Sequence, residues 1–230
     1  ISTVSHELRT PLSSISGALG LAVSGALGEM TASQQRMLQL AHSSCQQLSS
    51  LVNELLDVEK IASGTIALQL TPLSLQPLLA QTIHDMQLLQ PAITLKLDCP
   101  DSLSQVVVNA DPGHLQQVVR HLLGNAIKFS PRDGVVRVSV SREGDYIRVT
   151  VQDQGQGVAE HVVPRLFSRF SQTDSSDQRQ HGSTGLGLTI SRSLIGQMQG
   201  NMGFQPARGK GSCFYFELPF ISTLQPKQLP

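Results

Sequence analysis

The first quarter of the chain contains two stretches in which apolar residues recur every three or four positions. From residue 1 to about residue 25, this spacing predicts a helix with one apolar face. In the second stretch the apolar steps alternate between four and three, which is a heptad repeat. The two helices predict an antiparallel hairpin, which cannot bury its apolar stripes alone, so we expect a homodimer with a four-helix bundle. The predicted seam consists of Met37, Ala41, Ser44, Leu48, Leu51, Leu55, Val58 and Ala62.

The segment SHELRTPL, residues 5–12, lies on the first predicted helix. At about 100° per residue, His6 projects almost opposite the apolar stripe, and we expect its side chain to be exposed. Thr10 follows at i+4 on the same side, and Glu7 lies between these two residues and the seam. Pro11 removes an amide donor and should kink the helix. From these residues alone, His6 is a site of modification, a metal ligand or a solvated surface residue.

Beyond the hairpin the pattern changes to a mixture of helices and strands, which predicts an α+β chain whose second part is an α/β sandwich. Pro72 and Pro77 mark a connection between the two parts. We therefore expect a domain at 1–64, a linker at 65–74, a second domain at 75–220 and a tail or linker at 221–230. The predicted helices are 75–89, 112–129 and 187–199, and the predicted strands are 93–98, 106–109, 135–141, 146–152, 201–205 and 212–218.

Composition narrows the classes of partner. The chain has 17 basic and 17 acidic residues, so it has no net field to attract nucleic acid or an anionic membrane surface, and we expect neither contact. No apolar run approaches the roughly 18 residues that would cross a bilayer. Three cysteines without C-x-x-C spacing indicate neither a disulfide framework nor a zinc site and suit a reducing cytoplasm. The abrupt apolar start predicts a fragment of a longer protein.

Polar residues in the predicted helix 112–129 fall outside its apolar face, which contains Val118, Leu122 and Phe129. Asn125 and Lys128 share one side of the helix with His121. An amide oxygen suits Mg²⁺, and a lysine can meet a phosphate as a point charge. An ordinary amphipathic helix with a solvated face is the alternative.

Two glycine clusters follow. In DQGQGV, residues 153–158, Asp153 ends a predicted strand, and Gly155 and Gly157 let the backbone approach a ligand. A carboxylate in an apolar pocket would accept a hydrogen bond from the adenine amino group, whereas guanine would oppose it with a carbonyl oxygen, at a cost of roughly a few kcal/mol. A solvated glycine turn is the alternative.

The second cluster, GSTGLGL at residues 182–188, opens a predicted helix, whose first backbone amides can bind anions. Its spacing matches neither a P-loop nor a Rossmann fingerprint. The polar segment 171–183 before it is predicted to be a lid over the phosphates, with Arg169 and Arg179 as γ-phosphate contacts.

The order of these segments resembles the catalytic core of a sensor histidine kinase from a two-component system, and the lid is similar to those of hybrid kinases. The resemblance covers nearly the whole chain. It implies a dimerisation and histidine-phosphotransfer hairpin, followed by an ATP-binding domain of the type shared with type II topoisomerases and chaperone ATPases. The segments that carry it are SHELRTPL, HLLGNAIKFSP, DQGQGV, LFSRFSQ, GSTGLGL and GKGSCFYFELP.

The resemblance also implies residue roles. His6 would be the phospho-acceptor that passes its phosphoryl group to an aspartate of a response regulator receiver domain. Glu7 would orient its ring, and Thr10 would position a hydrolytic water in a phosphatase reaction on the regulator. In the second domain Asn125 would hold Mg²⁺ and Lys128 the phosphates of ATP. The remaining implied nucleotide contacts are Asp153 on adenine, Gly155 and Gly157 in its turn, Thr184, Gly185, Leu186, Gly187 and Leu188 on the phosphate side, Arg169 beside the γ-phosphate, and Phe167 and Phe170 as lid anchors.

One position departs from the family pattern. His121 stands where many members of the family carry Asn. Related ATPases carry a glutamate base near this position. A histidine supplies no carboxylate to activate water, so we expect poor hydrolysis of free ATP. A contact with a phosphate or a metal-bound water and a solvated helix residue are both open readings of His121. Two rival functions also remain, a catalytically silent ATP-binding dimerisation module and a protein-kinase-like anti-sigma factor on the same fold.

Overall fold

A computed structural model gives the structure of residues 2–26, 28, 30–64, 66–168, 185–207 and 210–223. These residues form two compact units. One holds the chain up to Ile66, and the other holds the described residues from Ala67 to Ser168 and from Gly187 to Thr223. Each unit is described by itself.

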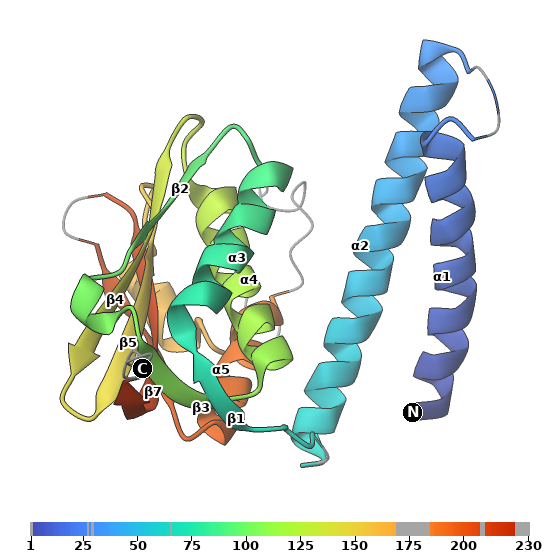
Figure 1. The fold of residues 1–230 in the computed structure, drawn as a ribbon. Helices are drawn as coiled ribbons and strands as arrows, with labels where there is room; N and C mark the ends of the chain where they lie inside the picture. Colours follow the sequence, from blue (N-terminus) through green and yellow to red (C-terminus); the bar gives the residue numbers. More distant parts are fainter. Residues whose placement is uncertain are drawn as a thin grey trace, which may run out of the picture. The chain divides into compact units, whose positions relative to one another are not determined.

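The first unit is a helical hairpin, as the periodicity predicts. Helix α1 (Ser2–Val23) and helix α2 (Ala32–Ala62) run alongside one another (Figure 1). A capping box starts α2: Thr31 Oγ1 accepts a hydrogen bond from Gln34 N at 3.3 Å, and Thr31 N donates to Gln34 Oε1 at 2.9 Å. Helix α1 continues through Pro11.

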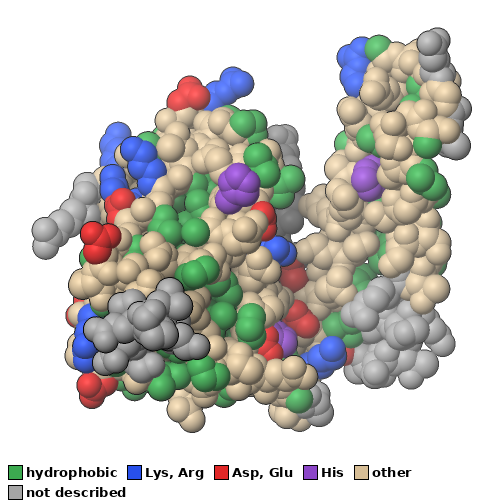
Figure 2. Space-filling model, viewed as in Figure 1, with side chains coloured by type: hydrophobic (Ala, Val, Ile, Leu, Met, Phe, Trp, Pro, Cys, Tyr) green, Lys and Arg blue, Asp and Glu red, His purple; other side chains and the backbone are tan. Residues whose placement is uncertain are grey.

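Packing within the hairpin uses only part of the apolar surface. Ala22, Cys45 and Leu56 are buried, and Val58 of the predicted seam is buried with them. Other seam positions are uncovered: Met37 is 71% exposed, and the predicted seam is also exposed at Ala41, Ser44, Leu48 and Leu55. Figure 2 shows hydrophobic side chains that reach the surface of the hairpin. A row of exposed apolar side chains on one helix is the surface that a second copy would cover.

Helices α3 (Leu75–Leu89), α4 (Pro112–Phe129) and α5 (Gly187–Gln197) of the second unit lie on one side of a twisted sheet (Figure 1). The strand order is β1-β3-β7-β5-β4-β2, with β6 paired to β7, and β2–β4 is the parallel pair. Short 3₁₀ turns span Asp101–Leu103 and Glu160–Arg165. The strands are β1 (Thr71–Ser74), β2 (Thr94–Asp98), β3 (Val106–Ala110), β4 (Val135–Glu143), β5 (Tyr146–Gln152), β6 (Asn201–Pro206) and β7 (Ser212–Thr223).

The core lies between the helices and the inner face of the sheet. Alternate strand residues are buried, as the period of two predicts. These strand side chains pack against a row of buried side chains on each helix. This packing confirms the predicted sandwich and the α+β class. The buried residues include Val136, Val138, Val140, Ile147, Val149, Val151, Phe216 and Leu218 from the strands, and Leu79, Leu115, Val119, Leu123, Ile190 and Leu194 from the helices.

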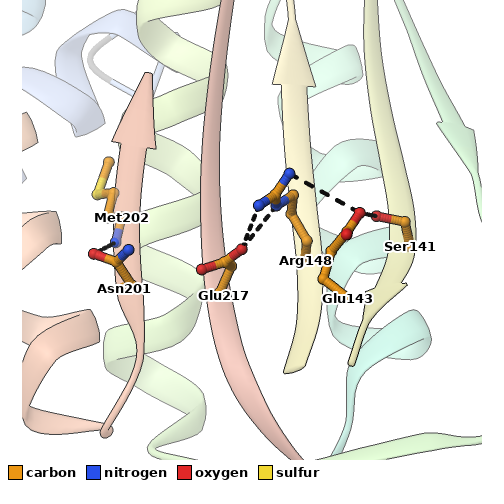
Figure 3. A network of polar contacts seen from close by, with 6 residues as sticks. All are labelled: Ser141, Glu143, Arg148, Asn201, Met202 and Glu217. Atoms are coloured by element: carbon orange, nitrogen blue, oxygen red, sulfur yellow. Dashed lines mark hydrogen bonds and ion pairs between the residues drawn. The ribbon is translucent and has the colours of Figure 1, made fainter. Parts of the chain in front are cut away.

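The outer face of the sheet is polar. Arg148 on β5 donates from Nη2 to Glu217 Oε1 on β7 at 2.6 Å, and its Nη1 lies 3.9 Å from Glu143 Oε1 (Figure 3). The guanidinium carbon lies 4.5 Å from the ring centroid of Tyr215. The hydrogen bond to Glu217 raises the pKa of Arg148. Charged side chains on this face explain why the helices cover only the other one.

The strands differ from the sequence prediction mainly at two places, while the other strand ends agree within two residues. Residues 71–74, predicted as the end of the linker, form β1, which pairs antiparallel with β3 from Thr71 opposite Ala110 to Ser74 opposite Val107. Strand β7 continues to Thr223 because its second half pairs with β3, whereas its first half pairs with β5 and β6. The predicted domain boundaries otherwise stay a prediction.

Replacing Leu48 and Leu55 together with lysine is expected to convert a dimer of this chain into monomers. Burying each leucine contributes roughly 1.5–3 kcal/mol, and buried ammonium groups would oppose association. The mass in solution, measured by sedimentation equilibrium, checks this. Gln46→Lys adds one lysine at an exposed position of α2 outside the seam and should leave the mass unchanged. A dimeric double variant would show that the seam is not the interface.

Candidate functional site

Asp153 lies directly after β5, and its side chain is only 2% exposed. Its Oδ1 accepts hydrogen bonds from Gly155 N at 2.8 Å and from Ser212 N at 3.0 Å, and its own backbone N donates to Ser212 O at 3.0 Å. Both side-chain bonds use Oδ1. The carboxylate is therefore held in place through one of its two oxygens.

Three glycines bring the backbone close to this carboxylate. A Cβ at Gly155 would lie 2.2 Å from Phe129 O, and a Cβ at Gly211 would lie 2.0 Å from Asp153 O. Gly157 and Gly211 also have positive φ angles of 80° and 113°. No other residue fits such space and such backbone angles. The reading of DQGQGV as a turn with a solvated Asp is therefore wrong, because Asp153 and Gly155 are buried.

Helix α4 carries the polar residues that the sequence singles out. Pro112 occupies its first turn, and Asp111 caps it by accepting a bond from His114 N at 3.0 Å. Its apolar row is buried at Val118, Val119, Leu122 and Ala126. Phe129 is expected on that row, but its side chain is 39% exposed. The helix ends at this residue, and the carbonyl oxygen of Phe129 faces Gly155.

Asn125 and Lys128 are half-buried on α4, three positions apart on adjacent parts of the helix surface. Burial lowers the pKa of Lys128, because the ammonium group loses part of its solvent. Its Nζ lies 5.1 Å from the ring centroid of Phe129. A nearby anion such as a phosphate would stabilise the charged form of a lysine that has lost part of its solvent.

His121 joins two helices. Its Nδ1 lies 3.1 Å from Oγ of Ser191, a fully buried residue of α5, and a Cβ at Gly187 would lie 3.3 Å from its Cγ. His121 is half-buried and contacts Ser191, so it is more than a solvated surface residue, and its contact with a phosphate or a metal-bound water stays a prediction. The ring holds the start of α5 beside α4 and fixes the spacing of the two helices that the sequence assigns to the nucleotide.

The glycine cluster before α5 is described only at its end. Gly185 has a positive φ of 69°, Leu186 is buried, and Gly187 begins α5 with Leu188 in its first turn. Arg169, Phe170, Thr184 and Arg179 lie outside the described residues.

Phe167 is attached to α5. Thr189 Oγ1 donates to Phe167 O at 3.1 Å, and the guanidinium carbon of Arg192 lies 5.0 Å from the Phe167 ring centroid. These contacts fit the predicted anchoring role of Phe167 at one end of the segment 171–183.

The remaining predicted site residues belong to the hairpin. The backbones of His6 and Glu7 belong to α1, and their side chains lie outside the described residues. Thr10 is exposed on the same helix. Among the side chains that the structure describes, no group of three His, Cys, Asp or Glu residues could hold a metal ion. None of the helices in the described part of the chain is both long and apolar enough to cross a membrane.

Comparison with known proteins decides the family. Residues 110–222 match the histidine kinase-, DNA gyrase B- and HSP90-like ATPase family, and residues 1–64 match the His Kinase A (phospho-acceptor) domain. The chain belongs to the histidine kinases. Its ATP-binding domain and its phospho-acceptor hairpin thus correspond to the two units of the structure.

Several individual histidine kinases are similar. The circadian input-output histidine kinase CikA of Synechococcus elongatus is 36% identical over 98% of this chain, which spans 30% of that protein. BarA of Escherichia coli strain K12, a signal transduction histidine-protein kinase, is 34% identical over 95% of this chain, which spans 24% of it. The crystal structure of full-length ShkA in complex with AMPPNP superposes with a TM-score of 0.76 at 33% identity, over 96% of this chain and 46% of that one.

Sequence reasoning missed Gly211 and Ser212 as parts of the site. They stand in the GKGS segment, which the sequence prediction used for the family resemblance alone. The structure adds the reason: Gly211 lets β7 approach Asp153, and Ser212 N donates to its carboxylate.

Changing Gly155 to Ala is expected to weaken ATP binding at least about tenfold and to lower stability by roughly 1–3 kcal/mol, because a Cβ would collide with the Phe129 carbonyl. Titration with a fluorescent ATP analogue and thermal unfolding measure the two effects. A Cβ at Gly196 on α5 would meet no atom within 4 Å, so Gly196→Ala is the matched control. Unchanged binding and stability in Gly155→Ala would contradict the close approach.

Proposed function

We propose that this histidine kinase transfers the γ-phosphoryl group of ATP to His6, and from His6 to an aspartate of a response regulator receiver domain. Family membership supports the class of reaction. The observation on this chain that carries the proposal is the buried Asp153 carboxylate, with one oxygen fixed by two backbone amides. Its second oxygen would accept a hydrogen bond from the adenine amino group. This arrangement selects a purine with an exocyclic amino donor.

The phosphate end of the nucleotide would meet α4 and the start of α5. Asn125 offers an amide oxygen, which fits Mg²⁺ when phosphates and waters supply the remaining ligands. Bound Mg²⁺ would neutralise charge on the triphosphate oxygens. Lys128, whose pKa burial lowers, would regain a stable charge beside a phosphate. Backbone amides from Thr184 to Leu188 would bind the phosphates, with Arg169 at the γ-phosphate and Phe167 and Phe170 anchoring the lid.

In the transfer step a neutral imidazole nitrogen of His6 attacks the γ-phosphorus in line. An N–P bond forms as the bond to the β-phosphate oxygen breaks, and ADP leaves. Glu7 would accept a hydrogen bond from the other ring nitrogen and orient the ring. Positioning supplies most of the rate, because the acceptor and the nucleotide belong to one assembly.

The proposed partners are a second copy of the chain and a receiver domain. The exposed seam of α2 supports association into the four-helix bundle. We propose that this region works in the cytoplasm, where ATP and receiver domains are present, and without contact to nucleic acid or membrane. The chain spans 30% of the length of CikA and 24% of that of BarA.

Incubation with γ-labelled ATP and Mg²⁺ is expected to give a protein label that is stable in base and lost in acid, as phosphohistidine requires. His6→Gln should abolish the label while the protein still binds a fluorescent ATP analogue. Asp153→Asn should abolish both, because it removes the acceptor for the adenine amino group.

These two variants separate the rival functions. Binding without any label in the wild type would identify a silent ATP-binding module. An acid-stable label that survives His6→Gln would identify a protein kinase of the anti-sigma type.

We also propose that Thr10 supports dephosphorylation of the regulator. Its exposed side chain follows the acceptor by one helical turn, where a hydroxyl can position a water. Thr10→Ala is expected to keep His6 labelling within about twofold and to slow dephosphorylation of the cognate phospho-receiver domain at least about tenfold. Thr10→Ser retains the hydroxyl and should retain the activity. Equal phosphatase rates in wild type and Thr10→Ala would contradict this role.

A further inference from the structure

Asp111 binds two segments of the chain with its two carboxylate oxygens. Oδ1 accepts the hydrogen bond from His114 N at 3.0 Å that caps α4, and the ring Nδ1 of His114 lies 3.0 Å from the same oxygen. Oδ2 accepts a bond from the backbone N of Gln69 at 2.9 Å. The residue is 9% exposed. Capping requires only one oxygen, so the bond to Gln69 needs a separate explanation.

The charge state of Asp111 keeps both bonds available. Burial acts to raise its pKa, but the hydrogen bonds from the backbone N–H groups of His114 and Gln69 outweigh it, and the pKa is lowered overall. The folded-state pKa lies below the unfolded value, so the stabilisation is present above the unfolded pKa and is lost only as the pH falls through the folded one. At neutral pH the side chain is a carboxylate with two acceptors.

Gln69 lies on the only covalent connection from α2 to the nucleotide-binding unit. Helix α2 ends at Ala62, and β1 begins at Thr71, which pairs with Ala110, the residue before Asp111. The bond between Gln69 and Asp111 therefore fastens the connection just before the sheet begins.

The other partner of Asp111 is the helix that carries the nucleotide groups. Helix α4 runs from Pro112 to Phe129, is anchored in the core at Leu115, Val118 and Leu122, and presents Asn125 and Lys128 near its far end. A helix packed in this way is a rigid element, so its first turn is held at a fixed position relative to Asn125 and Lys128.

We propose that Asp111 is a positioning residue, which ties the connection from the phospho-acceptor hairpin to the first turn of α4 and so sets the rate of transfer to His6 separately from the affinity for ATP. This inference rests on the proposed function of His6 and of α4. Loosening the tie would lower the effective concentration of the acceptor at the nucleotide without removing a nucleotide contact.

Substitution can separate the cap from the tie. Asn and Ser cap helices about as well as Asp. Asn has one acceptor oxygen, which can serve His114 N, and it would turn an NH₂ donor toward the Gln69 N–H. Ser is too short to serve both partners. The Gln69 donor is a backbone group, so Gln69→Ala keeps it and Gln69→Pro removes it while α4 is left intact.

The test measures three quantities on the chain of 230 residues for wild type, Asp111→Asn, Asp111→Ser, Gln69→Ala and Gln69→Pro. They are the Kd for an ATP analogue, the rate of His6 labelling at saturating Mg-ATP, and hydrogen exchange of the segment around Gln69. We expect Asp111→Asn, Asp111→Ser and Gln69→Pro to keep Kd within about threefold, to label His6 at least about tenfold more slowly, and to exchange faster around residue 69. Gln69→Ala should match wild type.

Each other outcome overturns the inference. If Asp111→Asn and Gln69→Pro label at the wild-type rate, the tie does not position the acceptor. If Kd rises as far as the rate falls, Asp111 only supports the nucleotide site. If wild type acquires no label, the proposed function fails, and hydrogen exchange still reports the tie: unchanged exchange in Asp111→Asn and Gln69→Pro would show that Asp111 does not hold the connection.

Discussion

The burial of the Asp153 carboxylate is the constraint on which the nucleotide-binding unit depends. A charge removed from water is tolerated only where hydrogen bonds replace the lost solvent, and here backbone amides of Gly155 and Ser212 do so. They reach the carboxylate because Gly211 lacks a Cβ, which would lie 2.0 Å from Asp153 O. The carboxylate proposed to bind adenine is thus held by backbone amides from two separate parts of the chain.

The turn that follows the buried Asp153 also holds the end of helix α4. The turn after Asp153 is attached to the chain on both sides of the α4–β4 connection, by the contact of Gly155 with Phe129 O and by a bond from Val135 N to Gln154 Oε1 at 2.9 Å. Helix α4 is therefore fastened at its end to the adenine turn and at its start, through Asp111, to the connection from the hairpin. In the proposed function, this one helix would link the nucleotide contacts to the segment that connects the hairpin to the second unit.

Local patterns predicted most of this architecture. The heptad repeat gave the hairpin and the uncovered seam, Pro112 marked the first turn of α4, and the strand before Asp153 placed that residue at a strand end. Strand β1 was missed because four residues with a proline on the edge of a sheet carry little local signal. The roles of Ser212, Ser191 and Gln69 depend on contacts with residues 59, 70 and 42 positions away, respectively. Spacing along a sequence contains no information on such contacts until the sheet has brought the segments together.

His121 illustrates how one unusual residue alters the chemistry open to this kinase. Its Nδ1 contacts Ser191, and Gly187 leaves room for its ring, so the side chain is part of the packing between α4 and α5. An imidazole in this place offers no carboxylate to deprotonate a water, whereas transfer to a histidine requires no such base, because the nucleophile is a neutral nitrogen. A site without a base to activate water would preserve the γ-phosphoryl group until an acceptor side chain reaches it. That property suits a kinase whose acceptor resides on a separate unit.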